Sequence, residues 1–164
     1  MILIPFFLIF LLLPAFAPWG RYAALAVFLA ASFTDCLDGW IARKYDMITD
    51  FGKLMDPMAD KILVISAMVA LVGISEMNSI ACIIILAREL LISGLRLVAA
   101  GKGSVVAADK WGKIKTVFQM LYIILVLAYN QGIFAIINQV VLWIAVILTV
   151  ISVMDYLIKN KNIL

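Results

Sequence analysis

The chain has 164 residues, of which 66% are hydrophobic and only 14% are charged, and its formal net charge is +3. Soluble globular domains are only about half apolar, so this composition excludes an ordinary soluble domain and suits a surface that faces lipid. Histidine is absent, so any acid–base chemistry falls to carboxylates, lysine, tyrosine or water.

A membrane-spanning helix takes about 20 apolar residues, so a chain of 164 residues has room for about six such helices and their connections. Breaks in hydropathy and turn residues predict the same number. Their expected ranges are 1–16, 22–44, 53–72, 78–100, 110–129 and 134–158. The first range lacks the basic start and the small-residue cleavage site of a signal peptide, so we expect it to be a membrane helix. The chain is therefore expected to be one all-α, polytopic membrane domain over residues 1–164 with six transmembrane helices.

The basic residues fall on one side of this predicted six-helix path. Those near the second-to-third loop, the fourth-to-fifth loop and the C-terminus are Arg43, Lys44, Lys53, Lys102, Lys110, Lys113, Lys115, Lys159 and Lys161. The opposite side holds little beyond Arg21 and Glu76. Because basic residues favour the cytoplasmic side of a membrane, the charged side and the N-terminus are expected to face the cytoplasm.

Four aspartates stand out between the apolar stretches. Asp35 and Asp38 are three positions apart near the end of the second predicted helix, and Asp56 and Asp60 are four apart early in the third. Each spacing places a pair on one helical face, and a short loop makes the two helices neighbours. Four carboxylates at a membrane edge need compensating cations, and ligands that are all oxygen suit Mg²⁺ or Mn²⁺.

A site with two divalent ions is a recurrent way to transfer phosphoryl groups, because the ions stabilise both the attacking and the leaving oxygen. Gly39 and Gly52 leave room for a ligand to approach the backbone, and Arg43 shares a helical face with Gly39. The alternative is that the aspartates only cap helices and solubilise a loop. That reading suits a single aspartate better than four at these spacings.

The stretch "DCLDGWIARKYDMITDFGKLMDPMAD", residues 35–60, has the pattern D-x2-D-G-x2-A-R-x8-G-x3-D-x3-D. This pattern resembles the signature of the CDP-alcohol phosphatidyltransferase family, with all eight fixed positions and all intervals present. The resemblance implies an enzyme with the fold of that family, which transfers a lipid phosphate from a CDP-linked lipid and releases CMP.

The resemblance also implies a role for each signature residue. Two divalent metal ions, Mg²⁺ or Mn²⁺, would be held by Asp35, Asp38, Asp56 and Asp60. Asp60 would also act as the general base that takes a proton from the acceptor hydroxyl. The nucleotide pocket would be formed by Gly39, Ala42, Arg43 and Gly52.

A second stretch places charged residues inside and beside the fourth and fifth predicted helices. The basic residues Arg88, Arg96, Lys113 and Lys115 could together bind an anionic substrate. Taken singly, each is equally well explained as an anchor at anionic lipid headgroups. Glu89 follows Arg88 directly, so we expect it to point away from Arg88 and the ion-pair partner to lie elsewhere.

The arrangement "ARE…GLR…AA…G…AA…GKIKT…QM" resembles the branch of the family whose acceptor is glycerol-3-phosphate. This implies transfer from CDP-diacylglycerol to sn-glycerol-3-phosphate in phospholipid biosynthesis, and an acceptor phosphate would explain the additional basic residues. The alternatives are a sister reaction, such as cardiolipin or phosphatidylinositol phosphate synthesis, and, from another class, a small ion carrier. A carrier would spread its acidic residues through the membrane depth, whereas here they gather at one boundary.

Members of the family usually begin with a short amphipathic segment that carries an Asn-rich and Thr-x-x-Arg stretch. This sequence starts at "MILIPFF", so that segment is expected to be absent and activity to be reduced. The resemblance further implies a homodimer in the plasma membrane with the active site facing the cytoplasm. No nucleic-acid partner is expected.

Overall fold

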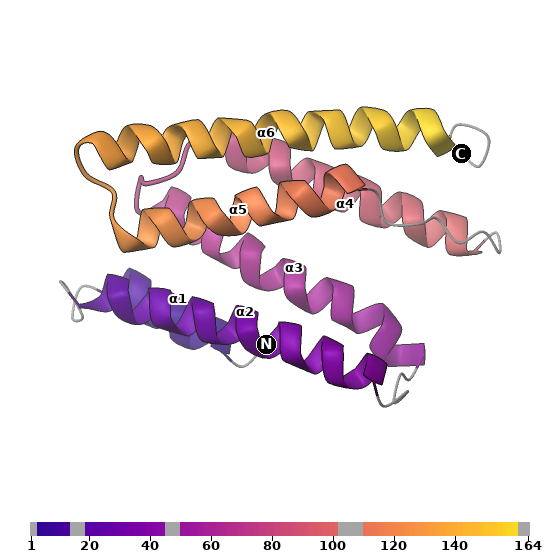
Figure 1. The fold of residues 1–164 in the computed structure, drawn as a ribbon, viewed down its shortest axis with the longest axis horizontal. Helices are drawn as coiled ribbons and strands as arrows, with labels where there is room; N and C mark the ends of the chain where they lie inside the picture. The colour runs from indigo at the N-terminus through magenta and orange to yellow at the C-terminus, as the bar shows by residue number, and fades with distance from the viewer. Residues whose placement is uncertain (1–2, 14–18, 45–49, 102–109, 161–164) are drawn as a thin grey trace. The chain divides into compact units, whose positions relative to one another are not determined.

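The fold is known from a computed structural model, which describes residues 3–13, 19–44, 50–101 and 110–160. Within these ranges, side chains are described except at 35–36, 38–44, 50–60, 96–101, 110 and 159–160. All regular secondary structure in the described ranges is α-helical (Figure 1). The helices are α1 (Leu3–Leu12), α2 (Gly20–Lys44), α3 (Asp50–Gly73), α4 (Ser79–Gly101), α5 (Lys110–Ala128) and α6 (Ile133–Asn160).

The expectation of an all-helical chain with helices at these places is confirmed for the described residues. The bounds of α2 to α6 differ from the predicted ranges by at most three residues. The first helix, expected over 1–16, is seen as Leu3–Leu12, and residues 14–18 lie outside the described part. Within the described residues, two helices are long and apolar enough to cross a membrane, Trp111–Ala128 and Ile133–Ile158.

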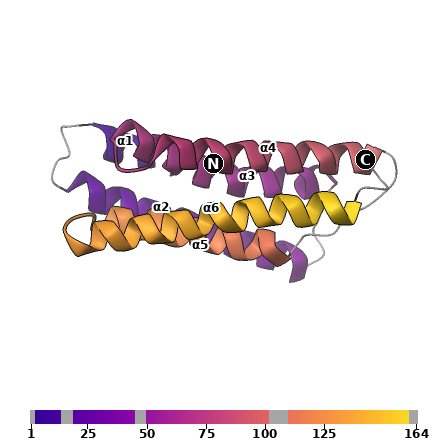
Figure 2. The same cartoon turned by 90° about the horizontal axis from the view of Figure 1, so that it is seen from above.

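Contacts divide the chain into two compact units, and the first consists of Met1–Glu76 together with Ile123–Tyr129. In this unit α1 packs on both α2 and α3, and α2 also contacts α3 (Figure 2). The rings of Phe7 and Phe28 meet with centroids 6.0 Å apart and join α1 to α2. Ala67 and Leu71, both fully buried, place small and large apolar side chains on the inner face of α3.

The end of α3 is a Schellman motif. The Glu76 N–H donates to the Leu71 carbonyl at 2.9 Å, and the Ser75 N–H donates to the Val72 carbonyl at 3.0 Å. Ser75 has a φ of 60°, the left-handed conformation that this motif requires and that glycine usually supplies. Gly73, which the sequence suggests as the helix terminator, is the last helical residue instead. The motif turns the chain between Gly73, at the end of the helix, and Glu76, three positions further on.

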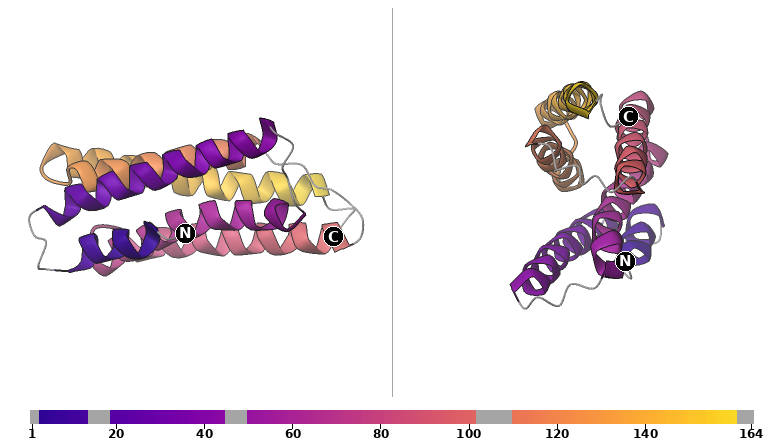
Figure 3. Two further views of the ribbon diagram at one scale, coloured as in Figure 1. Left: turned by 90° about the horizontal axis from the view of Figure 1, so that it is seen from below. Right: turned by 90° about the vertical axis from the view of Figure 1, so that its right-hand side faces the viewer.

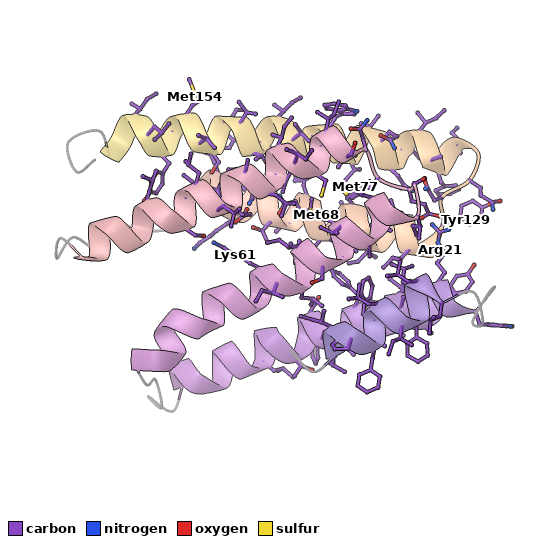
Figure 4. The ribbon with its side chains drawn as sticks, turned by 180° about the vertical axis from the view of Figure 1, so that it is seen from behind. Arg21, Lys61, Met68, Met77, Tyr129 and Met154 are labelled. Atoms are coloured by element: carbon purple, nitrogen blue, oxygen red, sulfur yellow. The ribbon has the colours of Figure 1, made fainter. Side chains whose placement is uncertain are left out.

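Arg21, at the start of α2, connects this turn to the last turn of α5. Its two terminal nitrogens donate to the Glu76 carboxylate at 2.8 and 2.5 Å. Its Nε donates to the Leu127 carbonyl at 3.1 Å, and Nη2 also donates to the Val126 carbonyl. Figure 4 shows Arg21 beside Tyr129, the residue that follows α5. The carbonyls at a helix C-terminus carry partial negative charge, so a guanidinium there satisfies both hydrogen bonding and the helix dipole. We call this group of contacts the Arg21 clamp.

The second unit consists of Met77–Tyr122 and Asn130–Leu164, and in it α4 packs against α6 (Figure 3). Asn78 caps α4, because its side-chain oxygen accepts hydrogen bonds from the Ile80 and Ala81 N–H groups at 2.9 and 3.3 Å. The inner face of α6 carries Leu142 and Ala145, both buried. Met154 projects from the outer face of α6 and is 58% exposed (Figure 4). An apolar outer face with a tightly packed inner face is what a helix in lipid requires.

Candidate functional site

The four aspartates of the signature lie on the two helices that the sequence predicts. Asp35 and Asp38 are in the second half of α2, and Asp56 and Asp60 are in the first half of α3. Since residues three or four apart share a helical face, each pair is placed on one face of its helix. The two helices contact each other within the first unit. The four aspartates thus lie on two helices that contact each other, and a shared carboxylate site between them stays a prediction.

The remaining signature residues are on the same two helices, with Gly39, Ala42 and Arg43 on α2 and Gly52 on α3. The side chains of the signature positions lie outside the described part, so their predicted roles stay predictions. Among the side chains that are described, no group of three or more His, Cys, Asp or Glu residues could hold a metal ion.

The second predicted set, the basic residues, includes two that meet at a buried carboxylate in the second unit. Glu89, on α4, forms an ion pair with Lys115 of α5. Its Oε1 also lies 3.5 Å from Nη1 of the neighbouring Arg88. All three side chains are buried, with exposed fractions of 9% for Glu89, 7% for Arg88 and 1% for Lys115. Nη2 of Arg88 donates to the Ser152 hydroxyl of α6 at 2.5 Å. We call these four residues the Glu89 cluster.

The expectation that Glu89 points away from Arg88 is wrong. Side chains at adjacent helix positions leave the axis in different directions, but the arginine stem is long enough to bring its guanidinium back toward the neighbouring carboxylate. The expectation of a partner elsewhere is confirmed, since Glu89 pairs with Lys115 on α5 and Arg88 bonds to Ser152 on α6. Both contacts join residues on different helices that are far apart in the sequence, so local sequence pattern could not predict them.

The other two basic residues of the set are placed differently. Lys113 is exposed on α5, and residues two positions apart on a helix do not face each other, so Lys113 and Lys115 leave α5 in different directions. Arg96 is on α4, and its side chain lies outside the described part. The structure thus brings Arg88 and Lys115 to one carboxylate and places Lys113 on the surface.

Gly112 also belongs to this region; it begins the stretch "GKIKT" that resembles the family, but it was assigned no role from the sequence. A Cβ atom at this position would lie 3.2 Å from Nη2 of Arg88 and 3.7 Å from Oγ of Ser152. Glycine therefore lets the α5 backbone come close to the guanidinium, and a Cβ at this position would require the Arg88 side chain to shift by a few tenths of an ångström. Ser152 was missed as well, because its contact with Arg88 joins residues 64 positions apart in the sequence. For Gly112 the available signal was its place at the start of "GKIKT".

The chain belongs to the CDP-alcohol phosphatidyltransferase family. The family's sequence profile matches residues 1–151, which include all six helices up to the last third of α6. This confirms the family resemblance drawn from the aspartate signature, and it makes the chain similar to a class of enzymes that transfer phosphatidyl groups.

Several similar proteins carry the name CDP-diacylglycerol–glycerol-3-phosphate 3-phosphatidyltransferase. The one from Bacillus subtilis is 40% identical, and the alignment covers 96% of this chain and 89% of the relative. The one from Haemophilus influenzae is 38% identical over 98% of this chain and 88% of the relative. A third, from Rickettsia bellii, is 38% identical over 85% of this chain and 80% of the relative.

Proposed function

We propose that this protein transfers the phosphatidyl group of CDP-diacylglycerol to sn-glycerol-3-phosphate, which yields phosphatidylglycerophosphate and CMP in phospholipid biosynthesis. The observation that carries the proposal is the alignment, over nearly the whole chain, with relatives that bear the name of this activity. The aspartate signature on two contacting helices supports it from the chemical side.

The donor set fits a pair of divalent ions. Asp35, Asp38, Asp56 and Asp60 supply only oxygen ligands, which Mg²⁺ and Mn²⁺ prefer. Their placement on one face each of two contacting helices supports a shared site. When bound, such ions would neutralise the pyrophosphate and stabilise the charge that develops during transfer.

Within this site Asp60 acts as the general base, a role that fits a chain without histidine. Asp60 takes the proton of the acceptor hydroxyl, and the oxygen attacks the phosphorus that carries the diacylglycerol. The bond between this phosphorus and the bridging oxygen breaks, and CMP leaves with the electron pair. Gly39, Ala42 and Gly52 leave room for the nucleotide, and Arg43 binds its phosphate.

The acceptor brings a phosphate of its own, and a second basic site serves it. Arg88, Arg96, Lys113 and Lys115 are the residues we assign to it. The support comes from Arg88 and Lys115, which reach one buried carboxylate from two different helices and so lie close together. Arginine and lysine are the side chains that bind phosphate most strongly in proteins.

The membrane setting we propose is a multi-pass protein of the plasma membrane with six spans and with the active site facing the cytoplasm. The clustering of basic residues on one side of the helical path supports this orientation. A homodimer is the assembly that the family resemblance implies, and the large apolar side chains exposed on α6 suit either lipid or a partner subunit.

The experiment that tests this function is an assay of purified protein with radiolabelled CDP-diacylglycerol, Mg²⁺ and glycerol-3-phosphate. We expect CMP release that depends on the acceptor, is abolished by a chelator and returns with added Mg²⁺. Parallel reactions with inositol phosphate or phosphatidylglycerol as the acceptor should release little CMP. If either of these supported turnover better than glycerol-3-phosphate, the proposed acceptor would be wrong.

Substitution of the proposed base gives a sharper result. Because general-base catalysis contributes about 100-fold to 10,000-fold, Asp60→Asn should lower kcat at least a hundredfold. The protein should still elute as a folded species from a size-exclusion column, because the amide has nearly the same shape as the carboxylate. An Asp60→Asn enzyme with kcat within a few fold of wild type would show that another group takes the proton.

A further inference from the structure

Glu89 is a charged residue of the second unit to which neither the reaction nor the signature assigns a task. Its carboxylate is buried and meets two cations, the ammonium of Lys115 and the guanidinium of Arg88 at 3.5 Å. A single carboxylate thus touches two of the four residues assigned to the acceptor phosphate.

The guanidinium of Arg88 is held from three helices. Glu89 contacts it from its own helix α4, and the Ser152 hydroxyl of α6 accepts a hydrogen bond from Nη2 at 2.5 Å. The backbone of α5 approaches it at Gly112, where a Cβ would lie only 3.2 Å from Nη2. These contacts leave the guanidinium little freedom to change its direction.

Stability alone is a poor explanation for such a cluster. Removing charges from water is costly, and apolar side chains of similar volume often stabilise a buried position as well as an ion pair does. What a bridging carboxylate does supply is position, because it holds two flexible basic side chains in one arrangement before a ligand arrives. Preorganised donors bind an anion more tightly, since less side-chain entropy is lost on binding.

We propose that Glu89 is a positioning residue for the acceptor, which holds Arg88 and Lys115 in the arrangement that binds the phosphate of glycerol-3-phosphate. Glu89 itself does not touch the acceptor, and its effect passes through the two cations. This inference rests on the proposed function, because it deepens the assignment of the acceptor site.

The test is Glu89→Gln, which keeps the shape and removes the charge. Hydrogen bonds to charged groups contribute enough that losing them should raise the KM for glycerol-3-phosphate on the order of tenfold or more. The KM for CDP-diacylglycerol, measured at saturating acceptor, should stay within about twofold, since only one substrate depends on the pair. The matched control is Glu76→Gln, which removes the carboxylate that pairs with Arg21 in the first unit and should leave both KM values unchanged.

A double-mutant cycle with Lys115→Met shows whether Glu89 acts through Lys115. In the Lys115→Met background, Glu89→Gln should raise the acceptor KM much less than in wild type, because residues in one network are not additive. Glu89→Asp, which keeps the charge on a shorter stem, should recover part of the lost affinity. If Glu89→Gln fails to fold, the KM for glycerol-3-phosphate is measured on Glu89→Asp in its place.

Two outcomes separate the inference from the function on which it rests. No CMP release by the wild-type protein would remove the proposed function itself. An active wild type whose Glu89 variants lose thermal stability but keep the acceptor KM would overturn the inference alone, since Glu89 would then have a structural role only.

Discussion

At the scale of single residues, one glycine lies against the Glu89 cluster. Gly112 lets the α5 backbone approach Arg88, and its place in "GKIKT" does not show which residue it meets. The aspartates were different, because their spacing, number and neighbouring glycines indicated chemistry without any long-range information. Contacts across the fold, such as those of Ser152 and Gly112, could not be found from local pattern.

Gly112→Ala should separate crowding from helix stability. A Cβ at 3.2 Å from Nη2 of Arg88 forces the guanidinium to shift by a few tenths of an ångström, so the KM for glycerol-3-phosphate should rise several-fold. Alanine also favours the helix by about 1 kcal/mol over glycine, so the thermal midpoint in detergent should not fall by more than a few degrees.

The control for this change is Gly94→Ala on α4, where a Cβ would meet nothing within 4 Å. It should leave the acceptor KM unchanged and stabilise the protein slightly. If Gly112→Ala and Gly94→Ala behaved alike in the KM measurement, the close approach at Gly112 would have no functional weight.

At the scale of helices, the sequence predicted where α2 to α6 begin and end because glycine, charged residues and loss of hydropathy coincide at their ends. Lys110, for example, is both the predicted and the observed first residue of α5. The backbone conformation at the helix ends was harder to predict from the sequence. At the end of α3 the left-handed residue is Ser75 and not Gly73, because the Schellman motif is set by the hydrogen bonds of the turn.

The Arg21 clamp also belongs to this scale. The sequence identified Arg21 and Glu76 as the charges on the side opposite the basic loops, but it could not show that they meet each other and the end of α5. Arg21 donates hydrogen bonds to the Glu76 carboxylate and also to two backbone carbonyls of α5. Removing the guanidinium loses both sets of bonds, whereas removing the Glu76 carboxylate leaves the bonds to α5 in place. We therefore expect the two members of the pair to contribute unequally to stability.

Arg21→Gln should lower the free energy of unfolding by about 2 kcal/mol, since hydrogen bonds to charged groups contribute about 1.5–3 kcal/mol. Glu76→Gln should cost less, because the bonds from Arg21 to the α5 carbonyls remain. Thermal unfolding in one detergent would measure both. The double variant should be no less stable than Arg21→Gln alone, and additive losses would mean that the two residues do not act as one clamp.

At the scale of the whole molecule, composition correctly placed the chain among all-helical proteins suited to lipid, and the signature correctly placed it in its family. Both follow from features that short stretches of sequence contain. The number of spans and the orientation depend on how the chain is threaded through a bilayer, and our proposal for them rests on the basic residues at one side.

Cysteine labelling in intact cells tests this orientation. In a variant in which Cys36 and Cys82 are replaced by alanine, Gln131→Cys marks the α5–α6 turn and Ser104→Cys marks the connection between α4 and α5. A membrane-impermeant maleimide should label position 131 in intact cells, and position 104 only after permeabilisation. The reverse pattern would place the active site outside the cytoplasm, and labelling of both in intact cells would contradict the proposed path.

The Arg21 clamp has a consequence for how the protein is made. Arg21 precedes Glu76 by 55 residues and the α5 carbonyls by 105 and 106. At synthesis rates of about 5–20 residues per second, the last of these acceptors is made roughly 5–20 s after the arginine. During that interval, the Arg21 guanidinium is without the α5 carbonyls that accept its hydrogen bonds. The first compact unit is therefore completed only after most of the second has been synthesised, and a chain that stops after α4 lacks the acceptors that close it.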